Sequence, residues 1–553
     1  MAEDATPWRR PLGAAPLEGG RTRFRVWAPR ARIVAVAVGG AEVPLAHEGH
    51  GVFVAEAAAG PGEDYHLVID GGARLPDPCS RFQPEGVLGP SRVVDPAAFR
   101  WSAGGWEGLD PQSLVIYELH VGTFTRQGTF AGVATRLGEL RELGVTAIEL
   151  MPVATFPGER NWGYDGLYTW APHPAYGGPE GLAALVDAAH AQGLCVILDV
   201  VYNHLGPGAQ ALEAFGPYLA DGLETPWGPA LNLAGPGCGG AREWALQNAC
   251  MWLRDYRIDG LRVDAVHTME DPGPRHLAAE LCARTAAERR TAITIAECGA
   301  SDPRLVQGED EGGWGFDAQW SDGFHHALHA LLTGERDGYY AEVGSVADLA
   351  AASAGGPEPG AFVVYAQNHD QIGNRALGDR LPAPVRRLAA MWVLLSPFVP
   401  LVFMGEEHGE RRPFQFFTDH IDPRIAEATR RGRRRELAAF AGFGGELPDP
   451  QDPATFARSV IDPDRGDPQV RALYRDLLAL RRALPPDEPA VRFDEAQGWI
   501  GVRRGPLEVV GNFARRPAEV PVEAAEVVLA TGAGVDIGGD RLRLPALHGA
   551  VVR

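Results

Sequence analysis

The chain has 553 residues, of which 45% are hydrophobic and 22% are charged, and these proportions are typical of a globular protein. This length exceeds that of one ordinary hydrophobic core, so roughly two to four domains are expected. The formal net charge of −21 argues against nucleic acid or an anionic membrane surface as a partner, because both attract clustered positive charge.

The first residues, MAEDATPWRRPLGAAP, contain no apolar core of a secretory signal. The sequence has no uninterrupted run of about 18 apolar residues, so no membrane span is predicted. The six cysteines are scattered without a C-x-x-C pair, at Cys79, Cys195, Cys238, Cys250, Cys282 and Cys298. Such a distribution is typical of reduced thiols rather than of a disulfide framework or a zinc site. We therefore expect a cytoplasmic protein.

Residues 1–98 alternate short apolar runs with Gly and Pro turns. The runs are TRFRVWAP, RIVAVAVGG, GVFVAEAAAG and DYHLVID. Short strands separated by frequent turns predict a small, Ig-like β-sandwich domain. The Pro- and Gly-rich stretch at residues 76–96 indicates the end of this domain.

From residue 99 to residue 487, apolar runs of the β type recur between helix-like segments. The runs are LVIYELHV, AIELMPV, CVILDVV, GLRVDAV, AITIAEC, the weak FDAQW, AFVVYAQ and PLVFMGEE. Near-continuous apolar runs are typical of parallel strands that are covered on both faces. Eight such strand–helix units predict a (β/α)8 TIM barrel. A doubly wound open sheet is the competing architecture, but no G-x-G-x-x-G follows any of the runs.

Residues 488–553 follow one last amphipathic helix, QVRALYRDLLALRRALP. The stretches GWIGVRRG, LEVVGNFA, AEVVLATG and RLRLPALHG are short apolar runs bounded by turns. They predict a small C-terminal β-sandwich domain.

Polar residues cluster where four of the predicted barrel strands end, which is where a barrel carries its active site. They are Asp199, Asn203, His204, Arg262, Asp264, His267, Glu297, His369 and Asp370. Each acid alone is equally well interpreted as a helix cap or a loop partner. Their joint placement on one mouth, beside an arginine and histidines, instead predicts a catalytic site.

Three acids without a nucleotide loop or a metal-ligand cluster suit glycoside cleavage, which needs a proton donor and a carboxylate nucleophile or base. Arg262 lies two residues before Asp264, on the same face of the strand, so it can keep that carboxylate ionised. A protonated Glu297 needs a raised pKa, which neighbouring carboxylates can supply.

The stretches DVVYNH, GLRVDAVH, IAEC and QNHD resemble, in order, the four signature regions of the α-amylase superfamily of glycoside hydrolases. The N-terminal sandwich resembles the domain found in branching and debranching members. This resemblance implies a retaining mechanism in which Asp264 is the nucleophile, Glu297 the general acid/base and Asp370 the transition-state stabiliser.

The same resemblance implies a set of sugar contacts in the cleaved subsite. Arg262, His204 and His369 would hold the glucose, and Asp199 would orient Arg262. Tyr164, in NWGYDG, would stack on the sugar; the alternative is a buried loop aromatic.

Several longer stretches are similar to the maltooligosyltrehalose trehalohydrolases, a family within this superfamily. They are IYELHVGTFTRQGTF, FPGERNWGYDG, RVDAVHTM, FDAQWSDGFHHALHALLTGE, QNHDQIGNRALGDR and FQFFTDH. The resemblance implies hydrolysis of the α-1,4 bond next to the terminal trehalose unit of maltooligosyl trehalose, in a pathway with a maltooligosyl trehalose synthase. It also implies sugar contacts from His267 and Gln371 and from one or two of Trp320, Asp322, His325 and His326. For these last four the alternative is helix-start polar groups and core histidines.

Many amylases carry Lys-His shortly after the nucleophile, where this chain has His267 and Thr268, so ordinary amylase specificity is not expected. A 1,4-α-glucan branching enzyme and a non-catalytic glycan-binding barrel are the alternative functions. We expect no cofactor and no metal, because no cluster of hard oxygen ligands accompanies Asn203.

Overall fold

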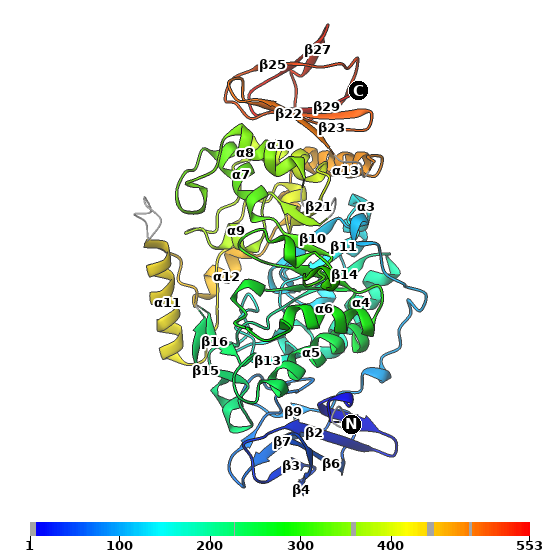
Figure 1. Ribbon diagram of the computed structural model, residues 1–553, viewed down its shortest axis with the longest axis vertical. Coiled ribbons are helices and arrows are strands. Elements are labelled where there is room, and N and C mark those ends of the chain that lie inside the picture. Colours follow the sequence, from blue (N-terminus) through cyan, green and yellow to red (C-terminus); the bar gives the residue numbers. More distant parts are fainter. Residues whose placement is uncertain (1–6, 226, 356–360, 439–446, 486–488) are drawn as a thin grey trace.

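The computed structural model describes residues 7–225, 227–355, 361–438, 447–485 and 489–553. Along its longest axis the protein places a β-sandwich at one end, a strand–helix barrel in the middle and a second pair of β-sheets at the other end (Figure 1). Within the described part of the chain, no helix combines the length and the apolarity that crossing a membrane requires.

The N-terminal sandwich has two sheets, with strand orders β1-β2-β6-β5 and β4-β3-β7-β8, and β9 pairs with β7. The strands are β1 (Gly13–Leu17), β2 (Arg21–Trp27), β3 (Val34–Val38), β4 (Ala41–Pro44), β5 (Ala46–Gly49), β6 (Val52–Ala58), β7 (Asp64–Ile69), β8 (Arg74–Leu75) and β9 (Ser91–Arg92). All four predicted runs lie in strands of these sheets.

The sandwich packs on the barrel through Trp27. Tyr218 donates a hydrogen bond to the Trp27 carbonyl oxygen at 3.0 Å, and the two rings pack edge to face with centroids 4.8 Å apart. Gly240, near the start of helix α5 (Cys238–Asp255), faces the same indole, and a Cβ there would lie 2.0 Å from a ring atom. Only a glycine therefore allows α5 to approach the sandwich this closely.

Eight parallel strands form a closed barrel, which confirms the predicted (β/α)8 fold. Around the barrel they are β10 (Ile116–Leu119), β11 (Ala147–Leu150), β14 (Cys195–Val200), β17 (Gly260–Val263), β18 (Ile293–Ala296), β19 (Ala318–Trp320), β20 (Phe362–Tyr365) and β21 (Val399–Phe403). Each predicted run contains one strand, including β19 in the weak run FDAQW, except that β21 begins one residue before PLVFMGEE.

Helices cover the outside of the barrel. They include α2 (Phe130–Ala134), α3 (Leu137–Leu143), α4 (Gly178–Ala191), α5, α6 (Leu277–Glu288), α7 (Asp322–Thr333), α8 (Val346–Ala354), α10 (Ala383–Leu394) and α13 (Pro468–Arg481). Two antiparallel hairpins that the sequence pattern did not predict leave the barrel as well, β12 (Ala154–Thr155) with β13 (Tyr168–Pro172), and β15 (Leu219–Thr225) with β16 (Gly228–Leu231).

The connection from β21 to α13 carries two further helices, α11 (Pro423–Ala438) and α12 (Pro453–Ser459). Helix α11 stands at one side of the molecule, outside the ring of barrel helices (Figure 1).

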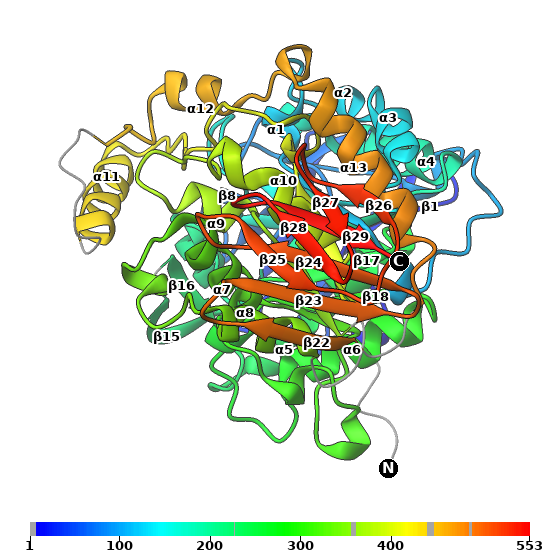
Figure 2. The same ribbon diagram turned by 90° about the horizontal axis from the view of Figure 1, so that it is seen from above.

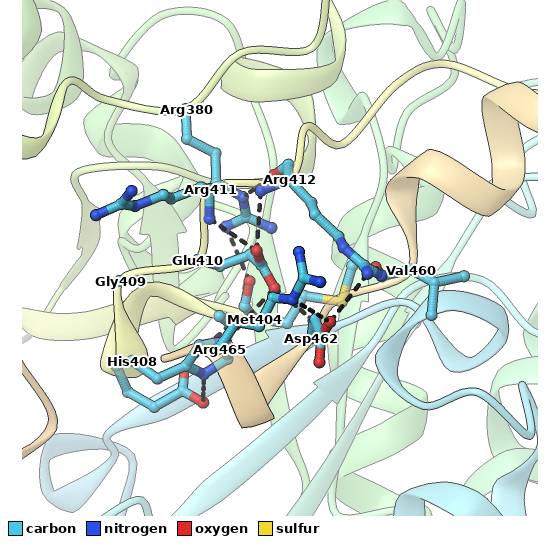
Figure 3. A network of polar contacts seen from close by, with 12 residues as sticks. Arg380, Met404, His408, Gly409, Glu410, Arg411, Arg412, Val460, Asp462 and Arg465 are labelled. Atoms are coloured by element: carbon cyan, nitrogen blue, oxygen red, sulfur yellow. Dashed lines mark hydrogen bonds and ion pairs between the residues drawn. The ribbon is translucent and has the colours of Figure 1, made fainter. Parts of the chain in front are cut away.

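A charged network fixes the start of this connection (Figure 3). The Glu410 carboxylate accepts hydrogen bonds from the backbone N–H groups of Arg411, Arg412 and Asp462 at 2.7, 2.8 and 2.5 Å. Arg412 donates to the carbonyl oxygen of Val460 at 2.8 Å and to the Asp462 carboxylate at 2.9 Å. Two segments about 50 residues apart in the chain are thereby held side by side.

The network continues into the short 3-10 helix η10 (Glu406–His408). His408 Nδ1 lies 2.9 Å from Glu407 Oε1, and its Nε2 lies 3.6 Å from Glu410 Oε2. We call Glu407, His408, Glu410, Arg412 and Asp462 the η10 network.

The C-terminal region has two sheets, with strand orders β22-β23-β24-β29-β26 and β25-β28-β27. Its strands are β22 (Ala490–Asp494), β23 (Trp499–Arg504), β24 (Leu507–Asn512), β25 (Ala518–Pro521), β26 (Val527–Ala530), β27 (Asp536–Gly538), β28 (Arg541–Leu544) and β29 (Gly549–Val552). The first of these sheets contacts α8 and α10, and seen from above α13 runs beside the sheets (Figure 2). The C-terminal β domain was predicted correctly.

Arg504 joins the C-terminal sheets to the barrel, because its Nη1 donates to the carbonyl oxygens of Leu395 and Ser396 at 3.1 and 2.9 Å. The predicted domain boundary at residues 487 and 488 lies outside the described residues. The other predicted boundary, after residue 98, coincides with the end of the 3-10 helix η2 (Pro96–Ala98). Both boundaries stay predictions.

Candidate active site

The barrel interior changes from apolar to charged toward the carboxyl ends of its strands. The apolar part includes Ile116, Ala147, Ile197, Ile295 and Leu401. Side chains two positions apart on a strand point to the same face, so the inward residues that follow are Glu118, Glu149, Asp199 and, on β17, Arg262. All four are buried. The charged residues thus form one layer at the catalytic end of the barrel.

Arg262 is the centre of this layer. Its Nη1 donates to both carboxylate oxygens of Asp199, at 2.9 and 2.8 Å, and to Asp264 Oδ1 at 2.8 Å. Its Nη2 lies 3.8 Å from Glu297 Oε2, so one guanidinium group contacts three carboxylates. Trp320 supports the guanidinium from the other side, with the ring centroid 4.3 Å away.

Glu297 follows β18, next to the strand that carries Asp264. The backbone N–H of Ala265 donates to Glu297 Oε2 at 2.6 Å, and Ala265 adopts a left-handed conformation with a φ of 41°. Burial raises the pKa of Glu297 to about 8; Arg262 opposes this shift, and the charge of Asp264 adds to it. Glu297 can therefore hold a proton near neutral pH.

His369 and Asp370 reach the same mouth from the end of β20. The Glu118 carboxylate accepts from His369 Nδ1, and it accepts from the His369 backbone N–H at 3.0 Å. His369 Nε2 lies 2.7 Å from the Tyr164 hydroxyl and 3.4 Å from Asp370 Oδ2. Burial opposes protonation, but the charges of Asp370 and Glu118 raise the pKa of His369 to about 9.

Tyr164 links the two halves of the site, because its hydroxyl also donates to Asp199 Oδ2 at 2.7 Å. His204 lies beneath it, with Nε2 3.1 Å from the Tyr164 carbonyl oxygen and Nδ1 2.9 Å from Asn203 Oδ1. Burial lowers the pKa of His204. The structure therefore brings together Tyr164, His204, Arg262, His369 and the three acids.

Three other candidate sugar contacts lie beside this group. Gln371 donates to Asp322 Oδ1 at 3.0 Å, and the charge of Asp322 contributes to the raised pKa of Glu297, after burial and the nearer charges. His267 is exposed, and its ring lies 3.9 Å from where a Cβ of Gly299 would be. Asp322 and Gln371 are partly buried and His267 is exposed, so none of the three is enclosed in the core.

Trp320 and His325 are placed differently. Trp320 is 2% exposed and packs under Arg262 inside the barrel. His325 is 1% exposed, and its two ring nitrogens lie 2.9 Å from the Ala366 carbonyl oxygen and 3.2 Å from the Tyr340 hydroxyl. Both positions match the alternative interpretation of these residues as part of the supporting structure.

Sequence reasoning missed Glu118, Glu149 and Trp227. Both carboxylate oxygens of Glu149 lack a hydrogen-bond partner among the described residues, and burial raises its pKa well above the usual range. The signal was present, because IYEL and AIEL each place an acid inside an apolar strand. Trp227 is 48% exposed, and its ring centroid lies 5.7 Å from that of His204; no local pattern indicates this position.

Family models and solved structures of α-amylase-type enzymes match this chain. The family model described as "Alpha amylase, catalytic domain" matches residues 94–215, and a domain of unknown function, DUF3459, matches residues 488–552. A solved putative alpha-amylase from Salmonella typhimurium is 35% identical, with a TM-score of 0.88, and the match covers 98% of this chain and 99% of that one. A pullulanase from Anoxybacillus at 19% identity, with a TM-score of 0.74, shares the fold alone over 98% of this chain and 87% of its own.

The malto-oligosyltrehalose trehalohydrolases from Rhizobium sp. (strain M-11) and Arthrobacter ramosus are 43% and 45% identical to this chain. The matches cover 98% and 96% of this chain and 99% of each relative. A 1,4-alpha-glucan branching enzyme from Corynebacterium jeikeium is 30% identical over 72% of this chain and 62% of its own. Near-complete coverage at these identities, together with the barrel and its acids, shows that the chain belongs to the malto-oligosyltrehalose trehalohydrolase family of α-amylase-type glycosidases.

Proposed function

We propose that this protein hydrolyses the α-1,4 bond next to the terminal trehalose unit of maltooligosyl trehalose and releases trehalose. The observation that carries the proposal is the different environment of two neighbouring acids. Arg262 Nη1 lies 2.8 Å from Asp264, whereas Glu297 is further from that cation and has a pKa of about 8. The guanidinium at hydrogen-bond distance orients Asp264 for attack, and the raised pKa suits Glu297 to be a proton donor.

In the first step, Asp264 attacks the anomeric carbon of the sugar in the cleaved subsite and forms a covalent glycosyl ester. Glu297 gives its proton to the glycosidic oxygen, so that trehalose leaves as a neutral alcohol. Asp370 and His369 bind hydroxyl groups of the sugar ring and support the positive charge that develops on it.

In the second step, Glu297 has become a carboxylate and acts as a base. It removes a proton from water, the water oxygen bonds to the anomeric carbon, and Asp264 leaves as a carboxylate. The maltooligosaccharide is released with its original anomeric configuration, and Glu297 is protonated again.

The choice of substrate rests on the names of the relatives and on the rim of the site. We assign Tyr164, His204 and Arg262 to the cleaved subsite, because Tyr164 and Arg262 bond Asp199, Arg262 bonds Asp264, and His204 lies against Tyr164. The rim residues are His267, Asp322 and Gln371, and they are assigned to the trehalose side. A maltooligosyl trehalose synthase would supply the substrate.

Product analysis tests the proposal. Purified protein is incubated with maltopentaosyl trehalose and, separately, with amylose. We expect free trehalose and maltopentaose from the first substrate and no new α-1,6 branches from the second. Branch formation on amylose without trehalose release would instead support the branching enzyme, and an Asp264→Asn variant serves as the control for contaminating activities.

A further inference from the structure

Asp370 lies on a very short helix, which does not by itself fix the orientation of its side chain. Helix α9 (His369–Gly373) has 5 residues, and so short a helix is unstable without outside contacts. The Asp370 side chain is 38% exposed, so packing does not fix its orientation. Its direction must come from hydrogen bonds.

Asn374, one turn further along, supplies such a bond. Its Nδ2 donates to Asp370 Oδ1 at 3.1 Å. The other end of the amide, Oδ1, lies 3.4 Å from Arg433 Nη1. A guanidinium group can only donate, so Arg433 holds the acceptor end of Asn374 and leaves the donor end for Asp370. A flipped amide would point its oxygen at the carboxylate and repel it.

Arg433 is well anchored for this purpose. It belongs to α11, and its Nη2 donates to the Gly373 carbonyl oxygen at 2.5 Å and to the Arg375 carbonyl oxygen at 3.5 Å. Its guanidinium lies over the Phe416 ring, 5.4 Å from the centroid. Arg375 is itself held by Glu335, with nitrogen–oxygen distances of 2.9 and 2.8 Å. Helix α11 therefore reaches the loop behind Asp370 from outside the barrel.

We infer that Asn374 and Arg433 are positioning residues for Asp370: Arg433, from α11, fixes the side-chain amide of Asn374 so that it donates to Asp370 and aims that carboxylate at the sugar. The inference rests on the role proposed above for Asp370. It assigns to α11, through Arg433, a part in catalysis.

The first test compares Asn374→Ala, Arg433→Ala and, as a matched control on the same helix, Arg431→Ala, whose side chain is exposed. We expect kcat to fall about 10- to 100-fold in the first two, with KM changed far less, because misplacing a catalytic group by about 1 Å costs up to about 10²-fold. Arg431→Ala keeps the wild-type kcat. Added guanidinium ion restores part of the activity of Arg433→Ala but none of that of Asn374→Ala.

The second test asks whether Asn374 acts through Asp370. Asn374→Ala is combined with Asp370→Asn, and turnover of α-maltotriosyl fluoride is measured for both single variants and the double variant. Residues that act as one unit are strongly non-additive, so Asn374→Ala should cause no further loss once Asp370 is replaced. A purely structural role would reduce activity equally in both backgrounds.

The two proposals fail in different ways. Cleavage of α-maltotriosyl fluoride by the wild type, without trehalose release from maltopentaosyl trehalose, would overturn the proposed substrate and leave the positioning test intact. Wild-type kcat in Asn374→Ala, or additive losses in the double variant, would overturn the positioning inference. Thermal melting of each variant identifies any that does not fold; Asn374→Ala decides the question if Arg433→Ala fails to fold.

Discussion

The active site and the η10 network both gather buried acids around arginine and histidine, but the acids behave in opposite ways. Burial raises the pKa in both places. In the η10 network burial is opposed by His408 together with other donors and charges, Arg136 at Glu407 and two backbone N–H groups and Arg380 at Glu410. Their sum lowers the pKa of Glu407 and of Glu410 to about 2. In the active site burial prevails, so the pKa of Asp199 rises to about 7 and that of Glu297 to about 8, although Arg262 opposes both shifts.

The difference lies in whether a carboxylate has donors of its own or shares one cation with other carboxylates. Glu410 alone accepts three backbone N–H groups, which makes its charged form stable and unreactive. In the active site, Arg262 serves Asp199, Asp264 and Glu297 together. Acids of the same kind are thus structural where each has its own donors and able to exchange protons where several share one cation.

Replacing the nucleophile should have the largest effect. Asp264→Asn is expected to lower kcat by more than about 10³-fold, roughly 4 kcal/mol of barrier, because an amide cannot attack the anomeric carbon. Its thermal midpoint should equal or exceed that of the wild type, since one carboxylate leaves a crowded cluster. Trehalose release and thermal melting measure the two effects. Activity within about tenfold of the wild type would rule out Asp264 as the nucleophile.

Replacing the proton donor should separate two kinds of substrate. Glu297→Gln is expected to lose hydrolysis of maltooligosyl trehalose but to keep the first step on α-maltotriosyl fluoride, because fluoride leaves without a proton. Burst kinetics with the fluoride detect that step. Equal impairment on both substrates would contradict the assignment.

The pH profile of the wild type sharpens the same assignment. With a pKa of about 8, Glu297 is protonated and active as an acid below that value and loses its proton above it. We therefore expect kcat/KM to fall on the alkaline side around this pH. The fall should be absent when α-maltotriosyl fluoride is the substrate and bond cleavage alone is measured. An alkaline limb common to both substrates would point to another group.

Breaking the η10 network should lower the thermal stability of the protein and leave its catalytic rate unchanged. Glu410→Gln removes the carboxylate that accepts three backbone N–H groups and lies 3.6 Å from His408 Nε2, and removing one member of a buried ion pair costs about 3 to 5 kcal/mol. We expect a lower thermal midpoint with an unchanged kcat at 25 °C. A large loss of kcat in a folded variant would mean that the network also supports the active site.

The stability of the protein should change with pH where the acids and the histidine of the η10 network titrate. Glu407 and Glu410 have pKa values lowered from 4.5 to about 2, so their contribution is present above 4.5 and is lost as the pH falls toward 2. The pKa of His408 is raised from 6.5 to about 9, so its contribution is complete below 6.5 and is lost as the pH rises through 9. His408→Gln should flatten the alkaline part of the melting-temperature profile, and an unchanged profile would contradict the prediction.

An exposed ion pair should have the smallest effect. Arg92 and Asp64 lie 2.6 Å apart in the N-terminal sandwich, each with about a third of its side chain exposed. Surface pairs contribute about 0 to 1 kcal/mol, so Arg92→Ala should shift the free energy of unfolding by less than about 1 kcal/mol and leave kcat unchanged. If Arg92→Ala lowered the free energy of unfolding more than Glu410→Gln does, the predicted order of the two effects would be wrong.

The sequence by itself determined the architecture and the end of the barrel at which the acids gather. Runs such as CVILDVV and GLRVDAV predict buried parallel strands, because a strand covered on both faces must be apolar almost throughout. Their polar ends at Asp199, Arg262 and Asp264 predict the side of the barrel that carries the chemistry, since all strand ends of one type meet at one rim. These inferences needed only local pattern and chain order.

Only the tertiary structure decided which side chains meet. Glu118 binds His369 across 251 positions of the chain, and Arg433 reaches Gly373 across 60. Trp320 lies at a strand end like the acids, yet it packs under Arg262. Contacts of this kind depend on how the closed barrel and the long connection after β21 fold back on themselves, and the local sequence around each residue carries no record of a partner so far away in the chain.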